Sequence, residues 1–230
     1  MLPITYLHFE TLSSTNTWVK GHAQELDPTH ITCVIADTQT EGRGRNNRPW
    51  VAPKGNLYMS LFLTLPKNSS YLLNIGQLLS LVCAEEWGLS IKWPNDLVVD
   101  GKKIGGILTE TISLDGRLGV IIGLGLNVNI LPEVEREVAS LRSLKGKMFD
   151  IRELARIITS SFAKELPALE QKGFSVFHTR YEKHLAYKGE KISFHQGDKK
   201  IEGVCEGVTE DGRLKLKTDQ TITLISGEIG

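Results

Sequence analysis

The stretch Gln39-Thr40-Glu41-Gly42-Arg43-Gly44-Arg45-Asn46-Asn47-Arg48-Pro49-Trp50 carries three arginines and two glycines between positions 42 and 48. It follows residues 31–36, an apolar and β-branched run that is typical of a buried strand. Glycine lets the backbone turn tightly and lie close to a ligand. The guanidinium fork of arginine fits carboxylate and phosphate groups. The stretch therefore predicts an ordered anion-binding loop at the end of a strand.

Two other interpretations of this stretch are a basic surface turn and a nucleic-acid contact. Gly/Arg repeats in RNA-binding tails belong to low-complexity segments, whereas this stretch is short and is flanked by Trp50 and a strand-like run. The whole chain has a formal net charge of zero and a pI near 7.0. A dedicated nucleic-acid binder usually has a basic face or a high pI. We therefore expect no DNA partner.

Composition bounds the remaining classes of protein. The chain has 230 residues, of which 40% are hydrophobic, enough for one large domain with a small appendage. The first ten residues lack the pattern of a signal peptide, and apolar runs such as 119–126 are too short to span a bilayer. Its three cysteines, all far apart in sequence, are typical of reduced, buried thiols. We expect a cytoplasmic protein with no membrane partner.

The order of predicted elements indicates an α+β fold. Asp100-Gly101 and Asp115-Gly116 are turn signals, so residues 91–123 form a meander of antiparallel strands. From about residue 186 short strands alternate with turns, and roughly 45 residues of this pattern predict a small β-barrel. We therefore divide the chain into residues 1–185 and 186–230. The other predicted elements are strands 4–9, 31–36 and 56–65, and helices 13–25, 71–87, 150–171 and 174–184.

Three further features bear on chemistry. Ser13-Ser14-Thr15-Asn16 stands at a predicted helix start, where hydroxyls either cap the helix or hydrogen-bond an uncharged polar ligand. Gly123-x-Gly125-x-Asn127 lacks the third glycine and the following helix of a dinucleotide fingerprint, so we interpret it as a strand end that directs Asn127 into a site. The six histidines show no metal-ligand spacing. Cationic, amide and hydroxyl candidates favour stabilisation of a transferring anionic group over nucleophilic catalysis.

Four motifs occur together in sequence order. They are Ser13-Ser14-Thr15-Asn16, the Gly42–Trp50 loop, Lys92-Trp93-Pro94-Asn95-Asp96 with Lys103-x-x-Gly106-Ile107-Leu108, and Gly123-x-Gly125-x-Asn127. The ordered set resembles the biotin protein ligase family, also called biotin–[acetyl-CoA carboxylase] ligases or holocarboxylase synthetases, over nearly the whole chain. The resemblance is to the short form, without an N-terminal DNA-binding domain.

This resemblance implies a fold and an activity. The fold would be a class II aminoacyl-tRNA-synthetase-like mixed sheet flanked by helices, with an SH3-like C-terminal β-barrel. The activity would be an ATP-dependent ligation that forms biotinyl-5′-AMP and transfers biotin to one lysine of a biotin carboxyl carrier protein. Biotin, ATP with Mg²⁺, and the carrier protein of acetyl-CoA carboxylase are the implied partners, and a homodimer is allowed.

The resemblance also assigns roles to individual residues. The implied catalytic residues are Arg43, Arg45, Asp96 and Lys103. The implied biotin-binding residues are Ser14, Thr15, Asn16, Gln39, Gly42, Arg43, Gly44, Arg45, Lys103 and Gly106. The implied ATP-binding residues are Arg45, Arg48, Trp50, Lys92, Asn95, Asp96, Lys103 and Asn127, with Asn127 also a candidate Mg²⁺ contact.

These residue types suit the implied chemistry. A carboxylate must meet the α-phosphorus of ATP, and cations such as Arg43, Arg45 and Lys103 offset the repulsion between the two anions. The mixed anhydride must be shielded from water, so we expect residues 42–50 to be mobile without biotin. Asp96 and solvent are alternative acceptors for the proton of the target lysine. Asn47 stands where the family often has glycine, and asparagine tolerates positive φ.

Two rival functions remain. A lipoate or octanoate ligase shares the overall logic, but the hydroxyl and amide groups of Ser14, Thr15 and Gln39 suit a neutral ureido ring better than an apolar lipoyl group. A non-enzymatic module that senses a small acid is the second rival. The number of cationic and amide candidates exceeds what simple capture of an acid requires.

Overall fold

A computed structural model describes residues 2–230 of the chain. Its main element is a seven-stranded mixed sheet in the order β1-β2-β3-β7-β6-β5-β4. The strands β1 and β2 are parallel and are connected through helix α1, whereas every other neighbouring pair is antiparallel. The strands are β1 Ile4–Leu12, β2 Ile31–Gln39, β3 Leu57–Pro66, β4 Ser90–Lys92, β5 Asp96–Val99, β6 Lys102–Leu114 and β7 Arg117–Leu126.

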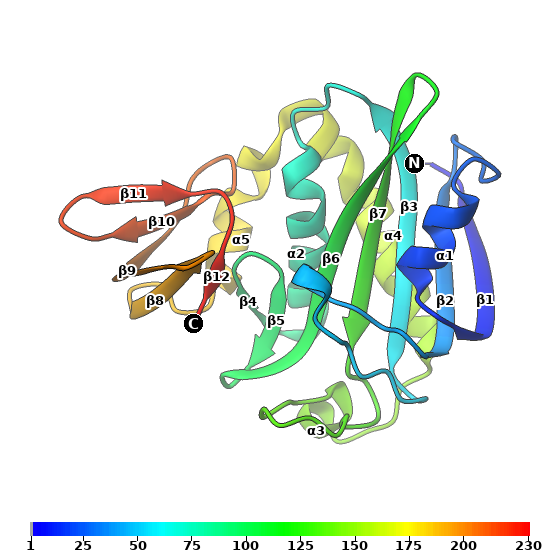
Figure 1. Cartoon of the computed structure of the whole chain (residues 1–230), viewed down its shortest axis with the longest axis horizontal. Coiled ribbons are helices and arrows are strands. Elements are labelled where there is room, and N and C mark those ends of the chain that lie inside the picture. Colours follow the sequence, from blue (N-terminus) through cyan, green and yellow to red (C-terminus); the bar gives the residue numbers. More distant parts are fainter. Residues whose placement is uncertain (1) are drawn as a thin grey trace.

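Helices cover both faces of this sheet (Figure 1). Helices α2 and α4 lie on one face, where their apolar residues join the main hydrophobic core. Helix α1 lies on the other face and buries Val19 in a second core with Val34, Phe62 and Ile121. The mixed sheet flanked by helices that the sequence predicted is confirmed. The helices are α1 Thr15–His22, α2 Ile75–Trp87, α3 Leu141–Lys145, α4 Ile151–Lys172 and α5 His178–His184.

Local signals in the sequence place most element boundaries. The Asp150 carboxylate caps α4 by accepting hydrogen bonds from the N–H groups of Arg152 at 2.8 Å and Glu153 at 3.0 Å, and Gly88 ends α2 in the left-handed region with φ 70°. The first helix is shorter than predicted. It ends at His22 because the chain turns there, with the N–H of Glu25 donating to the His22 carbonyl.

The meander prediction for residues 91–123 is confirmed. Strands β4 to β7 follow one another in both sequence and space, and Asp100 and Gly101 turn with φ 49° and 74°. The predicted helix over residues 174–184 is only partly α-helical, because residues Phe174–Phe177 form a 3-10 turn before α5. Two other 3-10 turns span Arg45–Asn47 and Leu72–Asn74.

The C-terminal residues form a separate five-stranded antiparallel sheet in the order β11-β10-β9-β8-β12. It lies beside helix α5 and beyond the β4–β5 end of the large sheet (Figure 1). Its last strand is only two residues long and pairs with β8. The strands are β8 Lys191–Gln196, β9 Lys199–Val208, β10 Leu214–Lys217, β11 Thr221–Leu224 and β12 Glu228–Ile229.

Three side chains of the larger unit hold one turn of the C-terminal sheet. Asn74 donates to the carbonyl of Asp211 at 2.9 Å. Gln77 and Trp93 both donate to the carbonyl of Gly212, at 2.7 Å and 3.0 Å. All three donors are nearly buried, so these bonds are protected from competition by water. The tryptophan of the Lys92–Asp96 motif therefore serves this junction.

The three cysteines, Cys33, Cys83 and Cys205, are buried and free. Burial raises the pKa of Cys33 to about 12, despite a hydrogen bond from Thr159 that opposes the shift. The sequence-based expectation of buried, reduced thiols is confirmed. No helix in residues 2–230 has both the length and the apolar character needed to cross a membrane.

Replacement of Gly212 by alanine should loosen the C-terminal sheet. Gly212 has φ 82°, and a methyl group there would collide with the Gln77 side chain and lie 2.7 Å from Asn74 Nδ2. We expect a loss of about 1–3 kcal/mol in the free energy of unfolding from the clash and the strained backbone, measured by urea denaturation. Gly197→Ala is the matched control, because Gly197 also has positive φ but has open space around it. Equal losses in both variants would contradict the assigned role of the junction.

Candidate active site

On the sheet face that α1 covers, glycines replace larger residues partway along the strands. Phe62 of β3 lies opposite Ile121 of β7, and both are fully buried beneath α1. Two and four residues further along β7, on the same face, stand Gly123 and Gly125. Gly106 of β6 lies directly opposite Gly125. Absence of side chains at these three positions leaves a hollow over the sheet.

A cavity of about 230 Å³ occupies this hollow. The start of α1, the loop of residues 42–50, the Lys92–Asp96 segment and strand β12 surround it. It brings together all but two of the site residues expected from the sequence. Those that line it are Ser14, Thr15, Asn16, Gln39, Arg43, Gly44, Arg45, Arg48, Trp50, Lys92, Asn95, Asp96, Lys103 and Gly106.

The two that do not line it are Gly42 and Asn127. Gly42 forms the neck of the loop, where its carbonyl accepts from the N–H of Trp50 at 2.8 Å. Asn127 was expected to point into the site, but its side chain is buried behind the end of β7 and donates to the carbonyl of Ala139 at 3.1 Å. The chain beyond β7 folds back over this position through the segment before α3, which the sequence pattern did not reveal.

The start of α1 makes one end of the cavity polar and uncharged. Thr15 donates to Gln39 Oε1 from both its backbone N at 2.8 Å and its Oγ1 at 3.2 Å. The Oγ of Ser60 lies 2.7 Å from Thr15 Oγ1 and 2.6 Å from Asn16 Oδ1. Gln39 Nε2 is turned toward Gly42, where a methyl group would lie 3.2 Å from it. Such an arrangement suits a neutral ligand group with both donors and acceptors.

Ser14 also caps α1. Its backbone is extended, with φ −158°, and its Oγ accepts from the N–H of Thr17 at 3.5 Å. The capping and ligand-binding interpretations of the Ser13–Asn16 motif are therefore compatible, because a capping hydroxyl that also lines the cavity keeps its proton available for a second partner.

The loop of residues 42–50 is a small hairpin. Besides the Gly42–Trp50 pair, the N–H of Gly44 donates to the carbonyl of Arg48 at 2.8 Å. At the tip, Asn46 and Asn47 both have φ 55°, a conformation that asparagine tolerates better than most residues. Asn47 therefore has the positive φ that asparagine was expected to tolerate at this position.

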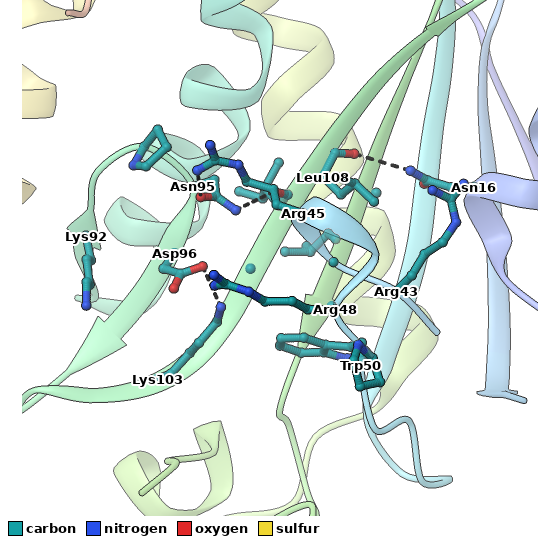
Figure 2. A pocket seen from close by; sticks show the side chains of 18 of the residues that line it. Asn16, Arg43, Arg45, Arg48, Trp50, Lys92, Asn95, Asp96, Lys103 and Leu108 are labelled. Carbon is teal, nitrogen blue, oxygen red and sulfur yellow. Dashed lines mark hydrogen bonds and ion pairs between the residues drawn. The ribbon is translucent and has the colours of Figure 1, made fainter. Parts of the chain in front are cut away.

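Arg43 and Arg45 leave this hairpin in opposite directions (Figure 2). The Nη2 of Arg43 reaches Glu110 of β6 at 2.9 Å and 3.1 Å. This glutamate is a residue of the site that the sequence analysis missed. The available signal was its position on β6, two and four residues after Leu108 and Gly106 and on the same face.

Arg45 and Arg48 extend toward the C-terminal sheet. Arg45 Nη1 donates to Asn95 Oδ1 at 3.2 Å and to the carbonyl of Gly227 at 3.0 Å. Arg48 Nη1 forms an ion pair with Glu228 at 2.7 Å. The last strand of the chain therefore closes one side of the cavity, a contribution with no signal in the local sequence.

Lys103 lies at the other end of the cavity with Asp96. Its Nζ is 2.5 Å from Asp96 Oδ1 and 5.4 Å from the centre of the Trp50 ring (Figure 2). Burial lowers the pKa of Lys103, the neighbouring charges of Arg136 and Lys92 lower it further, and Asp96 opposes both effects. The lysine is therefore a cation with a weakened hold on its proton.

Trp50 packs flat against the backbone of β7. A methyl group at Gly125 would lie 2.7–2.9 Å from three atoms of the indole, so glycine is required for this contact. The indole Nε1 is buried and has no hydrogen-bond partner within residues 2–230. A ring with one free donor beside a cation can stack on an aromatic ligand.

Comparison with known proteins decides the family. Residues 8–127 match the model of the biotin/lipoate A/B protein ligase family, and residues 188–229 match the biotin protein ligase C-terminal domain. The chain is 31% identical to the bifunctional ligase/repressor BirA of Escherichia coli over 95% of this chain and 71% of that protein. This chain belongs to the biotin protein ligase family.

Other relatives agree. The chain is 30% identical to the biotin–[acetyl-CoA-carboxylase] ligase of Paracoccus denitrificans over 80% of this chain and 83% of that protein. The solved structure of the Aquifex aeolicus biotin protein ligase in complex with biotin and ATP is similar, with a TM-score of 0.82 and 28% identity, over 98% of this chain and 97% of that one. The cavity of this ligase is therefore its candidate active site.

Titration of Lys103 provides a test of the site's electrostatics. In Asp96→Asn the carboxylate that stabilises the ammonium is lost while burial and the neighbouring cations remain, so the pKa of Lys103 should fall below its value in the unmodified ligase. NMR of ¹³C-dimethylated lysines as a function of pH measures this, with Lys103→Arg used to assign the resonance. An unchanged or higher pKa in Asp96→Asn would show that the ion pair does not hold the proton on Lys103.

Proposed function

We propose that this ligase joins biotin to the α-phosphate of ATP, with release of pyrophosphate, and then transfers the biotinyl group to one lysine of the carrier protein of a carboxylase. The observation that supports this proposal most directly is the division of the cavity. One end is neutral and polar, the other is cationic, and the arginine hairpin lies between them.

The polar end suits the ureido ring of biotin. Thr15, Asn16 and Gln39 orient one another through hydrogen bonds of 2.6–3.2 Å, directly or through Ser60. Their hydroxyl and amide groups are the partners that a neutral, amide-like ring requires. A lipoyl group offers no such hydrogen-bonding atoms, so filling this end with a lipoyl chain would leave buried polar groups unpaired at a cost of about 1–3 kcal/mol each.

The cationic end suits the reacting groups. Lys103 lines the cavity and would contact the biotin carboxylate and then the acyl-phosphate oxygens of the product. Of the three arginines in the hairpin, Arg45 is the one without a carboxylate partner in residues 2–230, since its two acceptors are an amide and a carbonyl oxygen. Its charge is therefore uncompensated and available for the phosphate, where charge builds up during the attack of the carboxylate.

The remaining residues that we propose for ATP binding also line the cavity. Trp50 lines the cavity and offers an indole face to adenine, while its Nε1 is buried against β7. Arg48, Lys92 and Asn95 are predicted cationic and amide groups that also line the cavity, and Arg136 is a further cation of the lining that the sequence analysis missed. With Gly44 at the hairpin and Gly106 on β6, main-chain atoms can approach the adenylate closely because no side chain intervenes.

Mg²⁺ would accompany ATP. In residues 2–230 no group of three or more His, Cys, Asp or Glu side chains could hold a metal ion by itself. Mg²⁺ is commonly held by substrate phosphates together with one or two protein oxygens, so a single carboxylate in the lining is enough for it. Asp96, which lines the cavity, is the oxygen donor that we propose, whereas Asn127 is buried outside the cavity lining and does not reach it. When bound, Mg²⁺ would offset phosphate charge.

In the second half-reaction the acceptor lysine must lose a proton. Asp96 lines the cavity and is the proposed base, although its Oδ1 is engaged with Lys103. Deprotonation by solvent is the alternative. A plot of log transfer rate against pH that is identical in the unmodified ligase and Asp96→Asn would assign the proton to solvent.

The activity is tested by biotin-dependent exchange of pyrophosphate into ATP, followed by transfer of labelled biotin to a carrier domain. We expect exchange with biotin but not with lipoate. Lys103→Gln should reduce exchange by about a hundredfold, as for other charge-stabilising groups at reacting oxyanions. Absence of biotin-dependent exchange in the unmodified ligase, or equal exchange with lipoate, would contradict the proposed function.

Arg45 should retain the adenylate within the site. In Arg45→Gly, loss of the guanidinium and its two hydrogen bonds should allow biotinyl-AMP to escape and to label bystander proteins, detected by streptavidin blot. Asn46→Gly is the matched control, because it also introduces glycine into the hairpin but at a position whose φ of 55° glycine adopts readily. Bystander labelling that is equal in both variants would assign the escape to loop flexibility instead of the lost charge.

A further inference from the structure

Glu110 stands where the polar end of the cavity meets the arginine hairpin. It lies on β6 in the same face as Gly106 and Leu108, both of which line the cavity. Its side chain is only 17% exposed. A carboxylate that points inward on a half-buried strand is costly unless it is paired, so its partners indicate its role.

One oxygen of this carboxylate holds two parts of the site at once. Glu110 Oε2 accepts from Asn16 Nδ2 at 2.9 Å and from Arg43 Nη2 at 2.9 Å. Asn16 belongs to α1 and is packed against Gly123 at the polar end, whereas Arg43 belongs to the hairpin. Three segments that are far apart in sequence therefore meet at a single acceptor atom.

We propose that Glu110 is a positioning residue that couples the two: it orients the Asn16 amide in the pocket for the small acid and, through Arg43, holds the hairpin over that pocket. The pairing also neutralises Arg43, so that Arg43 acts as an anchor of the hairpin. In identifying the small acid as biotin, the proposal rests on the function proposed above.

The contacts of Asn16 and of the hairpin explain why loss of Glu110 should affect one side of the cavity more than the other. The Oδ1 of Asn16 accepts from Ser60 Oγ at 2.6 Å. Its Nδ2 donates to Leu108 O at 3.3 Å and to Glu110 Oε2 at 2.9 Å. In Glu110→Gln, Arg43 loses its charged acceptor, and Arg43 and Asn16 are left with one neutral amide oxygen between them. The opposite side of the hairpin retains its own contacts, Arg45 to Asn95 and Arg48 to Glu228, so the loss should affect the biotin side selectively.

The test compares Glu110→Gln, Arg43→Gln and the double variant. In the ligand-free ligase, trypsin should cut after Arg45 about tenfold faster in each variant than in the unmodified chain, which corresponds to loss of one charge-assisted hydrogen bond. In pyrophosphate exchange, KM for biotin should rise by a similar factor while KM for ATP changes little. The double variant should be no more sensitive to trypsin than either single variant, because both changes break the same pair.

Lys20→Gln is the matched control. Lys20 Nζ lies 3.9 Å from Glu110 Oε1, but its side chain is 52% exposed and lies outside the cavity lining. Removing its charge alters the potential at the same carboxylate without breaking the Asn16–Glu110–Arg43 contacts. Unchanged trypsin cleavage and KM are expected.

The outcomes separate the two proposals. Cleavage of Glu110→Gln at the unmodified rate, or equal rises in KM for biotin and ATP, would overturn the role of Glu110. Absence of exchange in the unmodified ligase would overturn the proposed function, and the trypsin assay would still test Glu110. If Glu110→Gln does not fold, Arg43→Gln decides, because it leaves the Asn16–Glu110 bond in place: slow cleavage after Arg45 would then refute the anchor.

Discussion

The site depends on three glycines that remove side chains from one patch of a sheet whose other positions are filled. Gly106, Gly123 and Gly125 lie at neighbouring positions of β6 and β7. Asn16 packs onto Gly123 and Trp50 packs onto Gly125. Each side chain meets backbone, so its distance from the sheet cannot shrink, and a larger residue at either glycine would displace it. The two ends of the cavity are therefore spaced by the strand itself.

Part of the positive charge in the cavity is paired with carboxylates before any substrate enters. Three of its cations face carboxylates: Arg43 faces Glu110, Arg48 faces Glu228 and Lys103 faces Asp96. Packing this many cations together without acids would destabilise the fold through mutual repulsion. This pairing has a consequence for binding, because the carboxylate of a substrate must compete with Asp96 for Lys103. Burial that weakens the hold of Lys103 on its proton adds to the sensitivity of this end to pH.

The C-terminal sheet contacts both the larger unit and the arginine hairpin that borders the cavity. Its Gly212 turn is fixed to α2 and to the Lys92–Asp96 segment. Glu228 of its last strand and Gly227 just before that strand contact the hairpin. At Gly227, with φ 143°, a side chain would strike Phe194 of β8. Glycine thus allows β12 to lie close to β8 and still reach the arginines. A disturbance at the turn has a direct structural path to the hairpin.

Features that depend on neighbours in the chain could be predicted from the sequence. These include the helix cap at Asp150, the turn at Asp100-Gly101, the meander, the existence of an ordered arginine loop and the family to which the ordered motifs belong. Short-range hydrogen bonds and side-chain periodicity govern these features, so they leave a local signal. Nearly all of the site residues predicted from the sequence line the cavity, although their mutual distances could not be predicted.

Contacts between residues that are distant in sequence could not be predicted in this way. The parallel pairing of β1 with β2, the burial of Asn127, the Glu110–Arg43 pair and the Glu228–Arg48 pair join residues that are distant in sequence, in the last case by 180 positions. Such contacts follow from strand register and from the docking of one sheet against another. An acidic residue in a strand has the same local pattern whether it faces solvent or an arginine, and the difference is its long-range partner.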